Sequence, residues 1–118
     1  MLVIEPHETT RLLWVTVLQS IGCRPIAVAN ATDAEETVEH VTPDLILTEL
    51  VLPDTQRAQI CRGLRAHPRT SGVPILVLTG WAYPPDLAAA QDIGADVVLT
   101  KPVSIATLVS TVRKLLGR

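Results

Sequence analysis

The sequence lacks every feature that would direct the chain into or onto a membrane. No apolar run approaches the ~20 residues that a helix needs to span a bilayer. The start, MLVIEPHE, has neither a basic region nor a long apolar segment of the kind found in secretory leaders. The ten Lys and Arg residues are scattered along the sequence, and the formal net charge is −2. We therefore expect a cytoplasmic protein that contacts neither membrane nor nucleic acid directly.

Motifs for metal, nucleotide or covalent chemistry are also missing. The two cysteines, Cys23 and Cys61, have no metal-ligand spacing and are expected to be reduced thiols. There is no GxGxxG, no Walker sequence, and no Ser-His-Asp or Cys-His arrangement at one sheet edge. The stretch EPHETTR has no glycine, unlike a flavin-type phosphate loop. These absences disfavour a flavin protein or another kind of enzyme, so we expect no catalytic residues.

What the chain does contain is an alternation of short Val, Ile and Leu runs with segments of helical period, broken at Gly and Pro. Such alternation predicts parallel βα units, whose strands are buried on both faces. The expected strands are Leu2–Glu5, Pro25–Ala29, Leu45–Glu49, Val73–Thr79 and Asp96–Thr100. With 118 residues, 47% of them hydrophobic, five units leave room for one domain, 1–118. Whether this domain belongs to a longer protein stays open.

Five helices are expected between and after these strands. They run over about Glu8–Ile21, from an N-cap at Thr32 or Asp33 to a point before Pro43, over Gln56–Ala66, over Asp86–Ile93 and over Ser104–Leu116. The first helix is expected to bury Leu12, Leu13 and Val17, with Trp14 as a further candidate. The last has one apolar stripe, made of Ile105, Leu108, Val109, Val112, Leu115 and Leu116.

Polar residues stand at the carboxyl ends of four expected strands. They are Glu5, Glu49, Thr79 and Lys101, the last in the pair Lys101-Pro102. Each alone is commonly a solvated loop residue. Because the carboxyl ends of parallel strands meet at one edge of the sheet, the four are predicted to converge on one pocket.

Three stretches carry a family resemblance: PDLILTELVLP, VPILVLTG and GADVVLTKPV. They resemble the receiver domain of bacterial response regulators, the CheY-like phosphoacceptor module of two-component signalling. The intervals of 44, 30 and 22 residues between Glu5, Glu49, Thr79 and Lys101 agree with it. The resemblance covers the whole chain. It implies a doubly wound, flavodoxin-like α/β fold with five parallel strands in the order 2-1-3-4-5.

The sequence departs from the family at the phosphoacceptor. Receivers carry an aspartate where Glu49 stands, and bind Mg²⁺ through it and a pair of acids after the first strand. Here that pair is Glu5-Pro6, so one acid is missing. Mg²⁺ wants several oxygen ligands in octahedral geometry, so Glu5 should support a weak metal site at best. Imidazole is a poor ligand for Mg²⁺, and His7 is expected to be structural.

Glutamate extends its carboxylate by one C–C bond, about 1.5 Å, into the space that a phosphoryl group would occupy. The resemblance implies that Thr79 and Lys101 contact the phosphoryl oxygens. A Glu49–Lys101 ion pair with a Thr79 hydrogen bond is therefore expected to imitate part of the phosphorylated state. This favours a non-phosphorylated interaction module. The alternative is a receiver that is phosphorylated on Glu49 or on Asp54.

Two further positions depart from the family pattern and also favour a non-phosphorylated interaction module. The aromatic residue that receivers carry on the last strand is replaced by Val98, and Arg57 stands where glycine is common. Trp81 and Tyr83 either supply a substitute aromatic contact beside the site or pack locally on the following prolines. The resemblance implies partners that are histidine kinase-related or effector proteins. It also implies the last two βα units as the face for effectors or for a homodimer.

Overall fold

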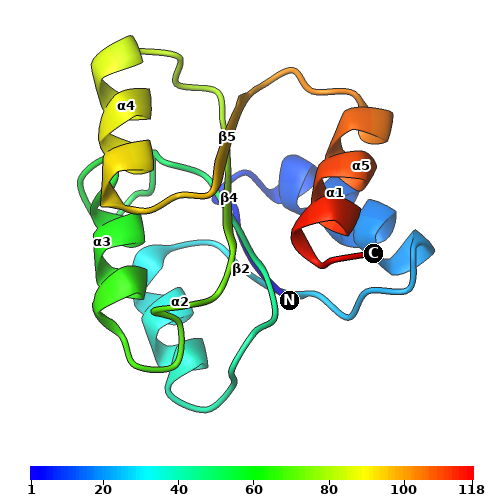
Figure 1. Ribbon diagram of the computed structural model, residues 1–118, viewed down its shortest axis with the longest axis horizontal. Coiled ribbons are helices and arrows are strands. Elements are labelled where there is room, and N and C mark those ends of the chain that lie inside the picture. Colours follow the sequence, from blue (N-terminus) through cyan, green and yellow to red (C-terminus); the bar gives the residue numbers. More distant parts are fainter.

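The computed structural model describes residues 1–118 and contains one five-stranded parallel sheet with helices on both faces (Figure 1). The strands are β1 Leu2–Ile4, β2 Ile26–Val28, β3 Ile46–Thr48, β4 Ile75–Thr79 and β5 Val97–Thr100. The helices are α1 Glu8–Ser20, α2 Ala31–Val38, α3 Gln59–Ala66, α4 Pro84–Ile93 and α5 Ile105–Leu115. The sheet order β2-β1-β3-β4-β5 confirms the predicted doubly wound topology.

Alternation along the strands divides the apolar residues between two cores. Leu2 and Ile4 of β1 face one side and Val3 faces the other, since successive side chains of a strand point to opposite faces. The side of Leu2 is covered by α2, α3 and α4, and the side of Val3 is covered by α1 and α5 (Figure 1). Both faces of the central strands are therefore buried, which explains the continuous apolar runs of β1, β3 and β4.

Burial differs from the prediction at the sheet edge and on two helices. Strands β2 and β5 are the two edge strands; Ile26 of β2 is 41% exposed and no residue of β5 is fully buried, so the expectation that they are buried on both faces was wrong. In α1 the core residues are Trp14, Val17 and Leu18, whereas the predicted Leu12 and Leu13 face solvent. The 3.6-residue period explains this, because Trp14, Val17 and Leu18 share one helix face, Leu13 lies beside that face and Leu12 lies nearly opposite it.

The last helix keeps most of the predicted stripe. Leu108 and Val112 are fully buried and Val109, Leu115 and Leu116 are half-buried, as one helix face against the sheet requires. Ile105 is 53% exposed, so its place in the stripe was wrong.

Helices α2 and α3 begin at other residues than predicted. The N-cap of α2 is Asn30, whose side chain accepts from the Asp33 N–H at 2.8 Å, and not Thr32 or Asp33. Three of the preferred cap types lie within four residues here, and composition does not choose between them. Helix α3 begins at Gln59, after a loop residue, Ala58, with a positive φ of 64°. None of the five helices is long and apolar enough to cross a membrane.

Two glycines after helices allow a matched test of backbone strain against side-chain contact. Gly94 has φ +121°, and a Cβ there would lie 2.9 Å from Arg65 Nε. Arg65 Nε donates to the Gly94 carbonyl at 3.0 Å, and its NH2 pairs with Asp96 at 2.9 Å. Gly22 has φ +86° with open space around the same position.

We expect Gly94→Ala to lower the free energy of unfolding by about 2 kcal/mol or more, from strain together with the displaced Arg65. Gly22→Ala should cost only the strain, about 1 kcal/mol. Urea denaturation followed by circular dichroism measures both. Equal losses would mean that the Arg65 contact contributes nothing to stability.

Candidate functional site

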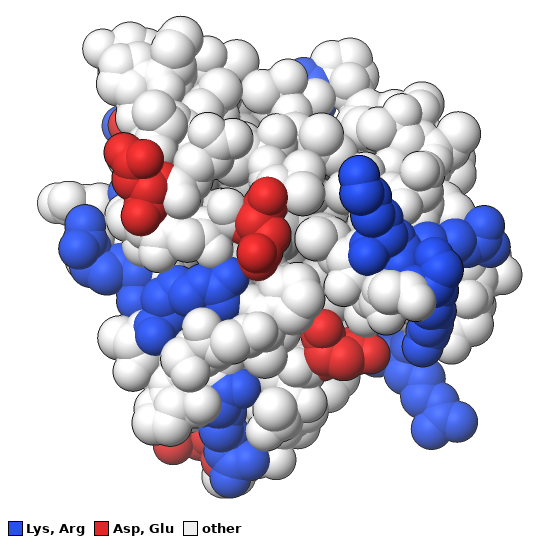
Figure 2. All heavy atoms as spheres, in the orientation of Figure 1, with Lys and Arg blue, Asp and Glu red and all other residues white.

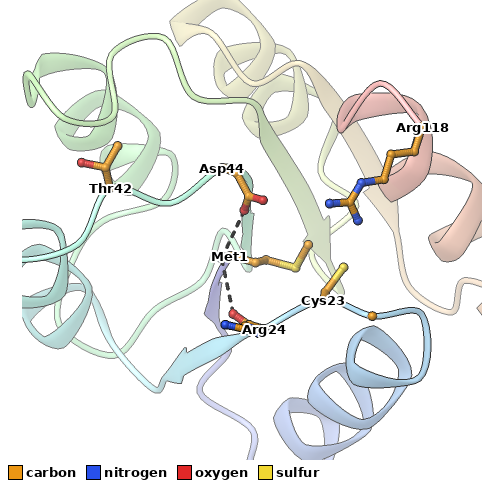
Figure 3. Close-up of a pocket in the computed structure, with 7 residues that line it drawn as sticks. Met1, Cys23, Arg24, Thr42, Asp44 and Arg118 are labelled. Atoms are coloured by element: carbon orange, nitrogen blue, oxygen red, sulfur yellow. Dashed lines mark hydrogen bonds and ion pairs between the residues drawn. The ribbon is translucent and has the colours of Figure 1, made fainter.

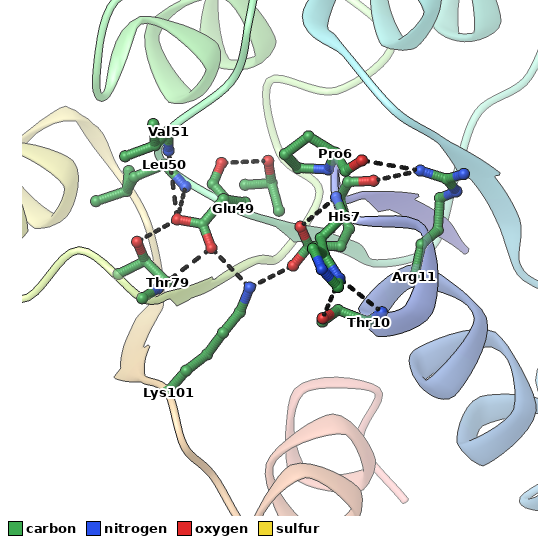
Figure 4. Close-up of polar contacts among 12 residues, drawn as sticks. Pro6, His7, Thr10, Arg11, Glu49, Leu50, Val51, Thr79 and Lys101 are labelled. Carbon is green, nitrogen blue, oxygen red and sulfur yellow. Dashed lines mark hydrogen bonds and ion pairs between the residues drawn. The ribbon is translucent and has the colours of Figure 1, made fainter.

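The strand order reverses at the carboxyl ends of β1 and β3. The chain leaves β1 for β2 on one side and returns to β3 on the other, and loops that diverge in this way leave a cleft between them. Glu5 directly follows β1 and Glu49 directly follows β3. Thr79 ends β4, and Lys101 directly follows β5. The four residues expected to converge do converge on this edge of the sheet (Figure 4).

The Glu49 carboxylate lies at the centre of the polar network and is only 6% exposed. Its Oε1 accepts from the Thr79 hydroxyl, and its Oε2 lies 2.8 Å from Lys101 Nζ. The remaining donors are the backbone N–H groups of Leu50, Val51 and Gly80, at 3.1, 3.3 and 3.3 Å. Both contacts expected of a glutamate here, the Lys101 ion pair and the Thr79 hydrogen bond, are thus present. Five donors converge on one side chain.

Lys101 bridges the two buried carboxylates. Its Nζ contacts Glu5 Oε1 as well as Glu49 Oε2, and Glu5 is 3% exposed. Burial alone would lower the pKa of Lys101, but the hydrogen bonds and charges of Glu49 and Glu5 outweigh burial and raise it above its ordinary value. The ammonium is therefore charged at physiological pH. Two carboxylates and one ammonium leave the site with a formal charge of about −1.

The turn after β1 fixes Glu5. The His7 N–H donates to Glu5 Oε2 at 3.1 Å, and Arg11 NH1 donates to the Glu5 carbonyl at 2.9 Å. His7 is the N-cap of α1, and its Nδ1 accepts from the Thr10 N–H at 3.3 Å. The imidazole is exposed and engaged in capping, in agreement with a structural role. Pro6 contributes only its carbonyl, to Arg11 NH1.

The donor set does not fit the magnesium ion that the receiver resemblance implies. All four carboxylate oxygens of Glu5 and Glu49 already accept hydrogen bonds, two of them from Lys101. No group of three or more His, Cys, Asp and Glu side chains is placed to hold a metal. Lys101 stands between the carboxylates that a cation would neutralise. A hard divalent ion would have to displace it and would find too few oxygen ligands.

Asp54 is placed away from this network. Its carboxylate accepts from the N–H groups of Ala31 and Thr32 at 2.9 and 2.8 Å and from the Thr32 hydroxyl at 2.7 Å. The Thr32 hydroxyl, followed by these backbone N–H groups, lowers the pKa of the Asp54 carboxyl. Asp54 thus joins the loop after β3 to the first turn of α2, where a carboxylate also complements the helix dipole.

Aromatic residues form a clasp next to the site. The Arg57 guanidinium stacks over the Trp81 ring at 4.0 Å, and Trp81 Nε1 donates to Asp86. Tyr83 packs edge-on against Trp81, with ring centroids 6.4 Å apart. The Trp81 N–H donates to the Thr79 hydroxyl at 3.0 Å, which connects the clasp to Glu49. Only the backbone of Trp81 reaches the site, whereas its ring contacts Arg57, Tyr83 and Asp86, so the two expectations for Trp81 stay open. Val98 packs on the α4 side of the sheet.

Sequence reasoning missed the backbone donors of the site. Leu50, Val51 and Gly80 act through their N–H groups, so their side chains carry no signal. The position of Glu49 at the end of a strand was the one available clue, because a strand that stops before a loop frees its next N–H groups. The partner of Arg57 was also missed, since it lies on a separate loop.

With this geometry in view, comparison with known proteins defines the class of the molecule. The model of the response regulator receiver domain matches residues 1–113, and the chain belongs to this family. Members of the family are signalling modules that interact with partners such as kinases and effectors. The chain is 33% identical over 117 residues to the DNA-binding response regulator MtrA of Mycobacterium tuberculosis, covering 99% of this chain and 50% of MtrA. It thus spans about half the length of the curated relatives that it matches first.

Solved structures agree with this assignment. A putative response regulator from Chloroflexus aurantiacus superposes with a TM-score of 0.91 at 27% identity, covering 99% of this chain and 96% of that one. The receiver domain of a sensor histidine kinase from Pseudomonas aeruginosa, solved with magnesium coordinated in its active-site cleft, gives 0.89 at 27% identity, with the same coverage.

The Lys101 bridge predicts how the site contributes to stability. Lys101→Met keeps most of the aliphatic stem but leaves two buried carboxylates without a cation. We expect the free energy of unfolding near neutral pH to fall by about 2–3 kcal/mol, because an unpaired buried charge is costly. Urea denaturation of the two proteins measures the difference.

The difference should also depend on pH. The raised pKa of Lys101 means that the folded state keeps this proton above the ordinary value of 10.5, where the unfolded chain loses it. Its contribution is fully present below 10.5 and is lost as pH rises through the raised value. The wild-type advantage should therefore shrink in this alkaline range. The buried Cys61 thiol, with a pKa of about 11, titrates equally in both proteins and cancels. A difference in the free energy of unfolding that stays constant over this pH range would contradict the proposed role of the Lys101 ion pairs.

Proposed function

We propose that this receiver domain is a pseudo-receiver: a protein-interaction module that is not phosphorylated in the usual way and in which Glu49 partly imitates a phosphorylated aspartate. The observation that carries the proposal is the set of five donors on the buried Glu49 carboxylate. Hydroxyl, ammonium and backbone N–H groups are the donors that phosphate oxygens also accept from. In this chain they are satisfied without a phosphoryl group.

Charge supports the same reading. A phosphoryl group brings about −1.5 to −2 at neutral pH, whereas Glu49 brings one negative charge, so the imitation is partial. Pro6 lowers the acidity of the site by one carboxylate relative to the family pattern, and the Lys101 bridge neutralises much of the remainder. The site therefore keeps a formal charge of only about −1 without a divalent cation.

The expected output of such a fixed state is a contact surface on α4, β5 and α5 that a signalling partner, either histidine kinase-related or an effector, recognises. Thr79 and Lys101 lie at the ends of β4 and β5, so their bonds to Glu49 hold the loops that lead into α4 and α5. The Trp81 N–H bond to Thr79 extends this hold to the loop before α4. The same face is proposed to serve if the chain dimerises.

The alternative function is a phosphorylatable receiver that uses Glu49 or Asp54 with a weak magnesium site. Against Glu49 stands the engagement of both its oxygens by five donors. Against Asp54 stands its bonding to Ala31 and Thr32 at the start of α2, away from Lys101. Neither carboxylate is free to attack a phosphoryl donor without breaking these contacts.

The deciding experiment compares wild type with a Pro6→Asp/Glu49→Asp variant, each titrated with Mg²⁺ and beryllofluoride. We expect no change in Trp81 fluorescence for wild type, because the oxygens that would bind the ligand are occupied. The double variant should gain a saturable, Mg²⁺-dependent response. A Trp81→Phe control assigns the signal to Trp81. The other tryptophan, Trp14, lies on α1 and is buried against the sheet. A wild-type response at millimolar Mg²⁺ would sink the pseudo-receiver proposal.

Amide chemical shifts test the imitation separately. If Glu49 stands in for a phosphoaspartate, the α4, β5 and α5 amides of the variant should move toward their wild-type positions when beryllofluoride is added. The neutral, equally long Glu49→Gln protein should lie at the other end of the same shift path. Movement of the variant away from wild type would leave a non-phosphorylated module but discard the imitation.

A further inference from the structure

The cations of the chain fall into two groups according to whether the fold uses them. Of the ten Lys and Arg residues, six have side chains held by ion pairs or hydrogen bonds. They are Arg11, Arg57, Arg62, Arg65, Arg69 and Lys101. The other four, Arg24, Arg113, Lys114 and Arg118, have no such partner; we call these four the basic pole. Their charges contribute nothing to the internal network.

The basic pole surrounds two adjoining hollows. Arg24 and Arg118 line one of about 410 Å³, together with Met1, Cys23 and Asp44, whose carboxylate is paired with the Met1 ammonium at 3.2 Å (Figure 3). Arg113, Lys114 and again Arg118 line the other, of about 560 Å³, with Ala106 and Val109 at its apolar part. Figure 2 shows Lys and Arg side chains gathered over the α5 side of the molecule. Charges that look scattered in the sequence are thus assembled by the fold.

The basic pole lies at the amino ends of the strands, whereas Glu49 lies at their carboxyl ends. Met1 precedes β1 and Arg24 precedes β2, so both lie at the amino ends of the strands. Helix α5 runs back across the sheet and carries Arg113 and Lys114 in its last turn. There they complement the helix dipole, which is a sufficient local reason for those two. Arg24 lies in a loop and has no such reason.

We propose that the basic pole binds an acidic segment of a partner protein, one with aliphatic side chains among its carboxylates. Three of the four cations are arginines, whose planar forks match carboxylates in two-point contacts. Met1 and Val109 offer apolar contact between the charges. Because the four side chains have no internal ion pair, binding breaks none.

A nucleic acid fits this surface less well. Affinity for nucleic acid draws on the number of phosphates that Lys and Arg neutralise, and this surface offers four cations on a chain whose formal charge is −2. The proposal is also independent of Glu49, because no contact joins the two regions. It stands or falls without the pseudo-receiver assignment.

The probe is a blocked, fluorescein-labelled peptide of repeating Glu-Glu-Leu, measured by fluorescence anisotropy at low ionic strength and again in physiological salt. Wild type should bind, and salt should weaken the binding. Arg113→Glu and Arg24→Glu should each weaken it about tenfold. The matched control is Arg62→Glu, which makes the same charge change at an exposed α3 position outside the basic pole and should stay within about twofold of wild type.

Three outcomes would overturn the proposal: no peptide binding by wild type, an equal loss in Arg62→Glu, or tighter binding of a duplex DNA than of the peptide. Arg113→Glu also opposes the α5 dipole, so its fold is checked by circular dichroism. If that variant unfolds, Arg24→Glu decides, because Arg24 lies outside every helix.

Discussion

The structure depends most on one ammonium group shared by two buried carboxylates. Glu5 and Glu49 follow neighbouring parallel strands, and the order of the sheet forces their side chains into one crevice. Without Lys101 the two negative charges would repel each other in a poorly hydrated place, where each would also carry a desolvation cost. Lys101 follows β5, the outermost strand on one side of the sheet. Its position therefore depends on the strands that separate β5 from β1.

The Glu49 carboxylate also reaches several elements of the fold. A glutamate reaches the Thr79 hydroxyl, the Lys101 ammonium and the Gly80 N–H at once. Thr79 and Gly80 stand at the start of the loop that leads into α4, and Lys101 stands at the start of the loop that leads into α5. One carboxylate thereby connects the end of β3 to the loops before α4 and α5.

The carboxyl and amino ends of the strands differ in how their charged side chains are paired. At the carboxyl ends of the strands, charge is buried, paired and close to balanced. At the amino ends, Arg24, Arg113, Lys114 and Arg118 are left without partners. Desolvation accounts for the first arrangement, since buried charge without a partner is destabilising. It sets no such demand on exposed cations, which are therefore free to serve recognition.

The sequence by itself determined the fold and the members of the site. Val, Ile and Leu runs separated by helical periods permit few topologies, and the spacing of Glu5, Glu49, Thr79 and Lys101 assigned each to a strand end. It did not determine which face of α1 is buried, and Leu12 and Leu13 were misplaced because neighbouring apolar residues blur a helical stripe. Only the tertiary structure decided that Asp54 bonds α2, that Arg57 stacks on Trp81, and that four distant cations share one surface. Contacts between loops depend on where the whole sheet places them, and no local pattern encodes that.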